Sequence, residues 1–334
     1  MSAVRRRALA MPAIVIVALA ILILFPLAEN GSQGTMSIAV FAVMFMAAVS
    51  GWNIFSGYSG YLALGHAVFF GTGAYTVALA AQDWHVPGGW TVFALLPLAG
   101  LVAGIAAIPV GIIALRTRRH TFVVVTIAIF FVFQLLAFNL PFTDGTSGIQ
   151  LPTALWSPST YNEPFYYVTL AILALTVALS WGVRRSRFGL QLMAIRDDED
   201  RARGMGVRTG PVKLAAFTLS AIPVGMVGGM YAYFLGAIYP QVGFDPLFDI
   251  AIALMGFIGG LGTIAGPLLG GLMLESLQQY FTQQFSDNGL YLIIYGALFL
   301  VVILLLPRGV IPSASAFYRS WRAHRSPAVA EAAP

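Results

Sequence analysis

Long runs of apolar residues recur along the chain, and short polar stretches that carry most of the charges separate them. Runs of this length can cross the roughly 30 Å hydrocarbon core of a bilayer as helices. The pattern predicts an all-α, polytopic membrane helical bundle of about ten spans. The predicted spans are 11–28, 37–55, 61–81, 90–115, 121–140, 165–183, 212–236, 247–258, 264–284 and 289–306.

Segment 247–284 fits two arrangements. The run 247–258 is short, and "FIGGLGTIAGPLLGG" (257–271) is rich in glycine, so the segment forms either two full spans or a re-entrant pair beside eight spans. Glycines along 57–73 and 256–271 let helices pack closely, or let a helix unwind so that its backbone faces a polar substrate. Both interpretations stay open.

The second to fifth and the seventh to tenth spans run in opposite senses across the membrane, which predicts an inverted repeat from orientation alone.

Charge gives this topology a sidedness. The chain is 59% hydrophobic and 9% charged, and ten spans with a cytoplasmic N-terminus place all 18 Lys and Arg residues on one side. Positively charged loops stay cytoplasmic, so we expect both termini and loop 184–212 in the cytoplasm and loop 141–164 outside. Residues 1–310 then form the transmembrane domain, and 311–334 form a cytoplasmic, flexible tail. We expect a multi-pass protein of the cell (plasma or inner) membrane.

Composition also excludes several functions. The isoelectric point near 9.6 is explained by basic loops beside anionic lipid and does not indicate nucleic acid. The chain has no cysteine, and its only lysine, Lys213 in "PVKLA", does not belong to a nucleotide-binding P-loop. Proton-coupled carriers are expected to carry buried carboxylates, but only His66 lies well inside a span, with Asp249 and Glu275 near predicted ends. We find no catalytic or metal-binding constellation and predict that the chain is not an enzyme.

The charges concentrate in "IRDDEDRARGMGV" (195–207), within the longest internal loop. Helix-forming residues followed by Gly204 and Gly206 predict a short surface helix over about 196–206. Such a helix suits a protein partner, although an ordinary solvated loop is the alternative. In the external loop 141–164, prolines and small polar residues predict an ordered loop rather than a helix, with Trp156 and Tyr161 as candidates for docking a partner on the outer face.

Four stretches carry a family resemblance. "SRFGLQLMAIRDDEDRARGMGVRTGPVKLAAFTLSA" (186–221) resembles the coupling segment of the LivM-type permease subunit of branched-chain amino acid ABC importers. "WNIFSGYSGYLALGHAVFFGTGAYT" (52–76) and "LMGFIGGLGTIAGPLLGG" (254–271) are similar to two further motifs of that family. "TDGTSGI" (143–149) is similar to a fourth, with Asp144 where glycine is usual.

The resemblance implies a permease subunit that forms the translocation pathway for branched-chain or related amino acids. It implies a LivH-like second permease subunit, two LivG/LivF-like ATPase subunits and an extracytoplasmic solute-binding protein, with ATP and Mg²⁺ bound by the ATPases and no cofactor in this chain. The rival class is an ATPase-independent channel or facilitator for a small polar solute such as urea or an amide. The resemblance assigns ATPase coupling to Arg196, Asp197, Glu199, Asp200, Arg201, Ala202 and Gly206.

Weakly polar residues inside the spans are candidates for lining the pathway, because a weakly polar wall allows release of a neutral or zwitterionic solute. A histidine in such a position is otherwise a hydrogen-bonded packing residue, and a glycine a site of close helix contact. The candidate pathway residues are Asn53, Ser59, His66, Thr72, Tyr75, Gln134, Gly259, Gly260 and Gly262.

Overall fold

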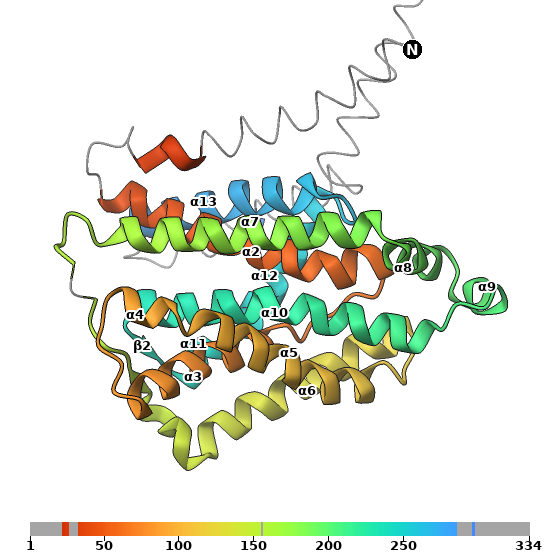
Figure 1. Ribbon diagram of the computed structural model, residues 1–334, viewed down its shortest axis with the longest axis horizontal. Helices are drawn as coiled ribbons and strands as arrows, with labels where there is room; N and C mark the ends of the chain where they lie inside the picture. The colour runs from red at the N-terminus through yellow and green to blue at the C-terminus, as the bar shows by residue number, and fades with distance from the viewer. Residues whose placement is uncertain (1–21, 27–32, 155, 286–295, 298–334) are drawn as a thin grey trace, which may run out of the picture.

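The computed structural model describes residues 22–26, 33–154, 156–285 and 296–297 of the 334-residue chain. Most of these residues are helical, as the apolar pattern predicts (Figure 1). The elements are α2 (Gln33–Ser59), α3 (Ala67–Asp83), α4 (Trp90–Phe93), α5 (Leu96–Ala114), α6 (Arg119–Asn139), η1 (Pro141–Thr143), η2 (Gly145–Ser147), β1 (Ile149–Gln150), α7 (Asn162–Arg185), α8 (Arg187–Asp197), α9 (Glu199–Gly204), α10 (Thr209–Leu235), β2 (Ala237–Ile238), α11 (Pro240–Gly243), α12 (Pro246–Gly259) and α13 (Ala265–Phe285).

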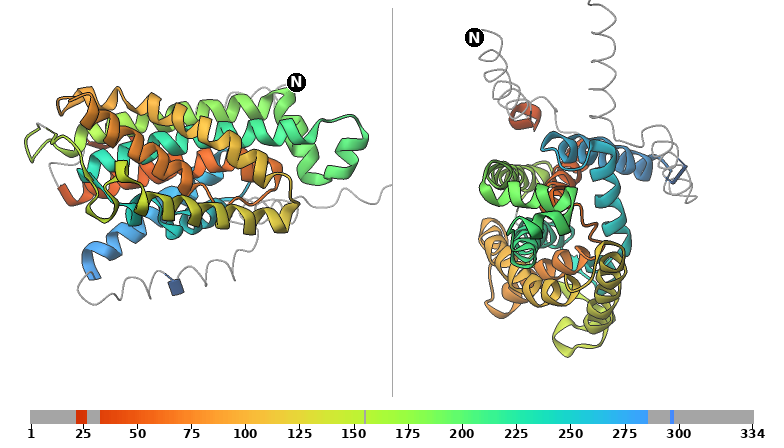
Figure 2. Two further views of the ribbon diagram at one scale, coloured as in Figure 1. Left: turned by 90° about the horizontal axis from the view of Figure 1, so that it is seen from below. Right: turned by 90° about the vertical axis from the view of Figure 1, so that its right-hand side faces the viewer.

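The longest helices share one general direction in Figure 1, and the bundle has two distinct ends. Helices α8 and α9 lie at one end, and α11 and β2 lie at the other. Seen along the bundle, α12 lies crosswise to the helices viewed end-on (Figure 2, right). We call the two ends the α9 end and the β2 end.

The structure confirms that the chain contains several helices able to span a membrane, but it does not confirm the predicted number of ten. Within the described residues, six helical stretches are long and apolar enough to cross a membrane. They are Gln33–Ser59, Trp90–Ala114, Arg119–Asn139, Asn162–Arg185, Thr209–Leu235 and Pro240–Gly259. The polytopic all-α bundle is therefore confirmed, whereas the ten spans and the inverted repeat stay predictions. Most of the predicted spans 11–28 and 289–306 lies outside the described residues.

Glycines bring the central helices into backbone contact. Helix α10 packs against α3 and α5. A Cβ placed on Gly73 of α3 would overlap the carbonyl oxygen of Gly225 in α10, and one on Gly228 would overlap the carbonyl oxygen of Phe70. At this contact, the close-packing interpretation of the glycines is the one the structure supports.

The span predicted at 61–81 begins later, because residues 60–65 are not helical. Gly60 has φ +72°, a left-handed conformation that ends α2. The freed amides then bond to side chains: the Ala63 amide donates to Ser56 Oγ (3.2 Å) and the Leu64 amide to Thr126 Oγ1 (3.3 Å). Non-helical backbone inside a membrane bundle is stable only when its polar groups are satisfied in this way.

The loop predicted at 141–164 ends three residues earlier than expected, because α7 begins at Asn162. It contains the two 3₁₀ turns and β1, which pairs antiparallel with β2 in the register Ile149 to Ile238. Asp144 has φ +52°, which explains why a glycine suits this turn. The Trp156 ring stacks on Phe93 with centroids 5.8 Å apart, so one face of this candidate docking residue is already covered.

Candidate coupling site and pathway residues

The charged segment forms two helices rather than one over 196–206. Helix α8 ends at Asp197, and α9 runs from Glu199 to Gly204. The break lies at Asp198, whose Oδ1 accepts hydrogen bonds from the amides of Asp200 and Arg201, both at 3.0 Å. Asp198 is therefore the N-cap of α9, so one member of the acidic run has a structural role within the chain.

Helix α9 ends at glycine, as predicted. The Val207 amide bonds to the Ala202 carbonyl (3.1 Å), and the Gly206 amide bonds to the Arg203 carbonyl (3.0 Å). Gly206 has φ +88°, so this end is a Schellman motif, in which glycine takes the left-handed position at no steric cost. Space around a Cβ at Gly206 is open, whereas Ala202 is fully buried within the chain itself.

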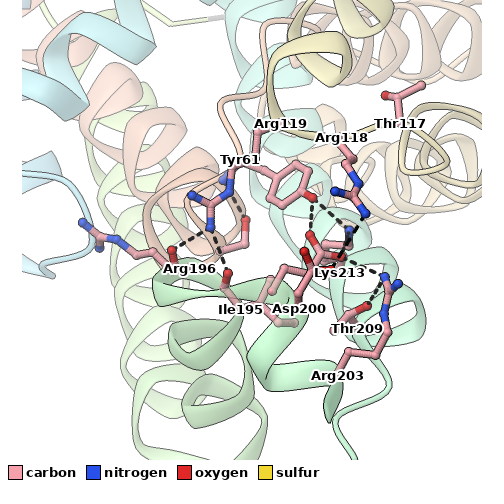
Figure 3. Close-up of polar contacts among 12 residues, drawn as sticks. Tyr61, Thr117, Arg118, Arg119, Ile195, Arg196, Asp200, Arg203, Thr209 and Lys213 are labelled. Atoms are coloured by element: carbon pink, nitrogen blue, oxygen red, sulfur yellow. Dashed lines mark hydrogen bonds and ion pairs between the residues drawn. The ribbon is translucent and has the colours of Figure 1, made fainter. Parts of the chain in front are cut away.

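Glu199 anchors α9 to two distant parts of the bundle. Lys213 Nζ, in the first turns of α10, lies 2.7 Å from Glu199 Oε1, and the Tyr61 hydroxyl donates to Glu199 Oε2 (Figure 3). Lys213 Nζ also donates to the Tyr61 hydroxyl (3.2 Å) and lies 4.4 Å from the centre of its ring. We call Tyr61, Glu199 and Lys213 the latch. The side chains of Lys213 and Glu199 are only 5% and 16% exposed.

The charge state of the latch follows from its geometry. Burial by itself would raise the pKa of Glu199, but the hydrogen bonds from Lys213 and Tyr61 and the positive charge of Lys213 outweigh burial and lower that pKa. Glu199 is therefore ionised at neutral pH, and the latch contains a paired charge shielded from water.

Arg196 makes a second attachment. Its Nη1 donates to the Gly57 carbonyl of α2 (2.8 Å), and a Cβ on Gly262 would overlap the same nitrogen. Arg119, the first residue of α6, donates to the carbonyls of Ile195 (3.1 Å) and Arg196 (2.7 Å). The end of α8 is thus fixed to α2, α6 and the loop between α12 and α13.

A cleft of about 500 Å³ separates the α5–α6 connection from α9. Arg116, Arg118 and Arg119 line one side, and acidic residues of 197–200 line the other. One ion pair spans it, between Arg118 and Asp200 at 3.9 Å, with side chains 84% and 71% exposed. Such an exposed ion pair contributes little to stability, so it does not by itself fix the distance between the two sides of the cleft.

The predicted coupling residues therefore divide into three groups. Arg196 and Glu199 connect the segment to the bundle, while Asp197, Asp200, Arg201 and Gly206 remain exposed. Ala202 belongs to the interior, since its side chain is 0% exposed. Its small side chain packs inside the chain itself. Met205, which the sequence reasoning did not consider, ends α9 with 74% of its surface exposed.

Several candidate pathway residues are engaged in internal bonds. Asn53 clamps the loop between α12 and α13: its Nδ2 donates to the Thr263 carbonyl and its Oδ1 accepts from the Gly262 amide, both at 2.9 Å. His66 Nε2 lies 2.9 Å from Ser220 Oγ, and Gln134 Nε2 donates to the Phe244 carbonyl (2.6 Å).

The other candidates also serve local structure. Ser59 and Thr72 donate to carbonyls four residues earlier, each at 2.7 Å. A Cβ on Gly259 would overlap the Gly266 carbonyl oxygen, and Gly260 and Gly262 have φ of +114° and +75°. Tyr75, stacked on Phe244, is buried and its hydroxyl has no partner among the described residues.

Sequence reasoning missed two residues with long-range roles. Asp249 of α12 is buried, and its Oδ1 accepts from the amides of His66 (2.8 Å) and Ala67 (3.1 Å), so it caps the N-terminus of α3. A carboxylate suits the partial positive charge there. Tyr61, in the non-helical stretch before α3, completes the latch. An acid beside an apolar run was the only sequence signal for Asp249, and Tyr61 gave none.

A helical membrane domain with an exposed charged helix fastened to several spans is typical of a transporter subunit that works with a partner. The chain matches the family model described as "Branched-chain amino acid transport system / permease component" over residues 34–303, and it belongs to that family.

Individual relatives agree with this family. The LivM permease protein of the high-affinity branched-chain amino acid transport system of Escherichia coli K12 is 27% identical over 310 residues, covering 84% of this chain and 71% of that protein. The LivH permease protein of Salmonella typhimurium is 29% identical over 187 residues, covering 51% and 57%. The autoinducer 2 import permease LsrC of Photorhabdus luminescens is 30% identical over 110 residues, covering 32% and 33%. No solved structure matches the chain.

Proposed function

We propose that this chain is a permease subunit of an ATP-binding cassette importer for branched-chain or related amino acids. The family match over residues 34–303 is the observation that carries the proposal. The chain would pair with a second, LivH-like permease subunit, take solute from an extracytoplasmic binding protein, and use ATP and Mg²⁺ bound by two LivG/LivF-like ATPase subunits. The α9 end would face the cytoplasm, with both termini on that side.

In this proposal α9 receives the movement of an ATPase and passes it to the bundle. The exposed residues Asp197, Asp200, Arg201 and Met205 would meet the partner. Arg196 and Glu199 then carry force inward, because they are bonded to α2, α6 and α10 rather than to one helix. Arg196 also adjoins Gly262, in the loop that Asn53 clamps, so the coupling residues and candidate pathway residues form one connected structure.

The proposal is tested by assembling the full chain with its second permease subunit, both ATPases and the binding protein in proteoliposomes. We expect ATP-dependent uptake of leucine that needs the binding protein. Met205→Glu should abolish substrate-stimulated ATP hydrolysis while the chain stays folded, whereas Gln191→Glu, an equal charge change at an exposed position of α8, should have little effect. Flux through the purified chain alone, without ATPases, would instead identify a facilitator.

Sidedness has its own test, because the chain contains no native cysteine. An impermeant thiol reagent applied to intact cells should label Ser159→Cys and not Arg203→Cys. Labelling of Arg203→Cys from outside would reverse the proposed orientation.

A further inference from the structure

A second cavity lies away from the latch, among α2, α3, α10, α12 and α13. Its volume is about 160 Å³. None of the candidate pathway residues is among those that line it, but Glu275, the carboxylate noted above near a predicted span end, is. Its walls combine two kinds of side chain that are unusual together in a membrane bundle, aromatic rings and carboxylates.

The aromatic wall is continuous. Phe248 lies 4.3 Å from Phe70 and 5.6 Å from Phe45, measured between ring centres. Tyr231 lies 5.3 Å from Phe70 and 5.9 Å from Phe41. Aromatic faces attract a cation electrostatically and also cover apolar groups, so a set of five rings around a small cavity suits a ligand that has both.

The opposite edge of the cavity is acidic and contains buried hydrogen-bond acceptors that have no donor among the described residues. Glu275 is 1% exposed, and its Oε1 accepts from Gln279 Nε2 at 2.8 Å. Glu275 Oε2 and Gln278 Oε1 have no hydrogen-bond partner among the described residues. Asp245 adds a second carboxylate to the lining, while no lysine or arginine of the described chain lines the cavity. A buried acceptor without a donor is costly, and here two adjoin one cavity.

We propose that this cavity binds a primary ammonium group carried on a small apolar chain. The ammonium would donate to Glu275 Oε2 and Gln278 Oε1, and its apolar chain would lie against Phe45, Phe70 and Phe248. Only the identity of the natural ligand, an amino acid that crosses the membrane, rests on the proposed function. The site itself rests on the unpaired acceptors and the rings.

Binding is tested on the full chain in lipid nanodiscs by titration calorimetry, with empty nanodiscs subtracted. The probes are 3-methylbutylamine and its neutral analogue 3-methyl-1-butanol. The wild-type chain should bind the amine at least about tenfold more tightly than the alcohol, because a charge-assisted hydrogen bond to a buried carboxylate is replaced by a neutral one. Equal binding of the two probes would overturn the proposal without any variant.

Variants locate the site. Glu275→Gln removes the charge at nearly constant volume, and Ala251→Phe fills the cavity while keeping the carboxylate. Each should weaken amine binding about tenfold or more. Glu163→Gln, the same chemical change at an exposed carboxylate of α7, should bind as wild type does. Undiminished amine binding by a folded Glu275→Gln or Ala251→Phe chain would overturn the assignment.

The same variants separate this inference from the proposed function. If the reconstituted importer works and Glu275→Gln leaves leucine uptake and amine binding unchanged, the site is wrong and the function stands. If the amine binds at Glu275 but no ATP-driven uptake occurs, the site stands and the function is wrong.

Discussion

Replacing Lys213 by methionine tests whether the latch holds α9 on the bundle. Methionine keeps most of the apolar stem and removes only the ammonium, which lies 2.7 Å from Glu199 Oε1. Two unit charges at that separation attract by about 6 kcal/mol at an effective dielectric constant of about 20. The cost of desolvating both groups offsets much of this. Lys213 is 5% exposed, and after its replacement Glu199 would remain largely buried with the Tyr61 hydroxyl and the longer Arg203 contact (3.5 Å) as donors, so we expect a loss of about 2–4 kcal/mol.

The assay is hydrogen exchange of α9 in the full chain in nanodiscs. The amides of Ala202 and Val207 bond within the α9 region and report its opening. Lys213→Met should speed their exchange by about 30-fold or more, the equivalent of about 2 kcal/mol. Adding Glu199→Gln to the Lys213→Met chain should restore part of the lost stability, since it removes the carboxylate charge that Lys213 no longer neutralises. The coupling energy between the two substitutions should be about 1–3 kcal/mol.

Two results would refute this reasoning. Exchange within about threefold of wild type would mean that the ion pair contributes less than about 1 kcal/mol. Strictly additive effects of the two substitutions would mean that the side chains do not act through each other. Arg201→Met provides the control, since the Arg201 side chain forms an ion pair with Asp198 and is 85% exposed.

Three further predictions concern other parts of the chain. Since the pKa of Glu199 is lowered, its stabilising effect should be complete above the ordinary glutamate value of 4.5 and disappear as pH falls through the lower folded value, with faster exchange in α9 as the measurement. Gly73→Ala should lower thermal stability by about 1–3 kcal/mol by overlapping the Gly225 carbonyl, whereas Gly182→Ala, which meets open space, should not; equal stabilities would exclude close packing as the reason. Asp144→Val should cost about 1–2 kcal/mol because φ is +52°, and Asp144→Gly should be tolerated; a stable Val variant would contradict the left-handed turn.

Local patterns were sufficient for much of the fold. Apolar runs located the long helices to within a few residues, because hydrophobic length alone decides whether a helix can span the membrane. Glycine after a charged helical run correctly indicated that α9 ends before Gly206, where left-handed backbone is required. The sequence also allowed Asp198 to be predicted as an N-cap. An aspartate just before a helix commonly marks its start, because its side chain accepts hydrogen bonds from the first free amides of the helix.

Contacts between distant residues could not be predicted in this way. Asp249 bonds to an amide 183 positions away, and Lys213 meets a hydroxyl 152 positions away. Nothing in the local sequence distinguishes a carboxylate that caps another helix from one that faces solvent. For the same reason, Tyr61 looked like part of a continuous span, although its backbone leaves the helix to reach Glu199.

Helix α2 spans 27 residues without a proline, so it is a nearly rigid lever about 40 Å long. Gly57, which accepts from Arg196, lies close to one end, and Phe41 of the aromatic cavity lies toward the other. The two positions are separated by about 24 Å along the helix axis. A tilt of about 5° imposed at Gly57 would therefore displace the Phe41 ring by about 2 Å. A cavity as small as 160 Å³ cannot absorb that displacement unchanged, so a tilt of α2 driven from α9 would also change the shape of the cavity.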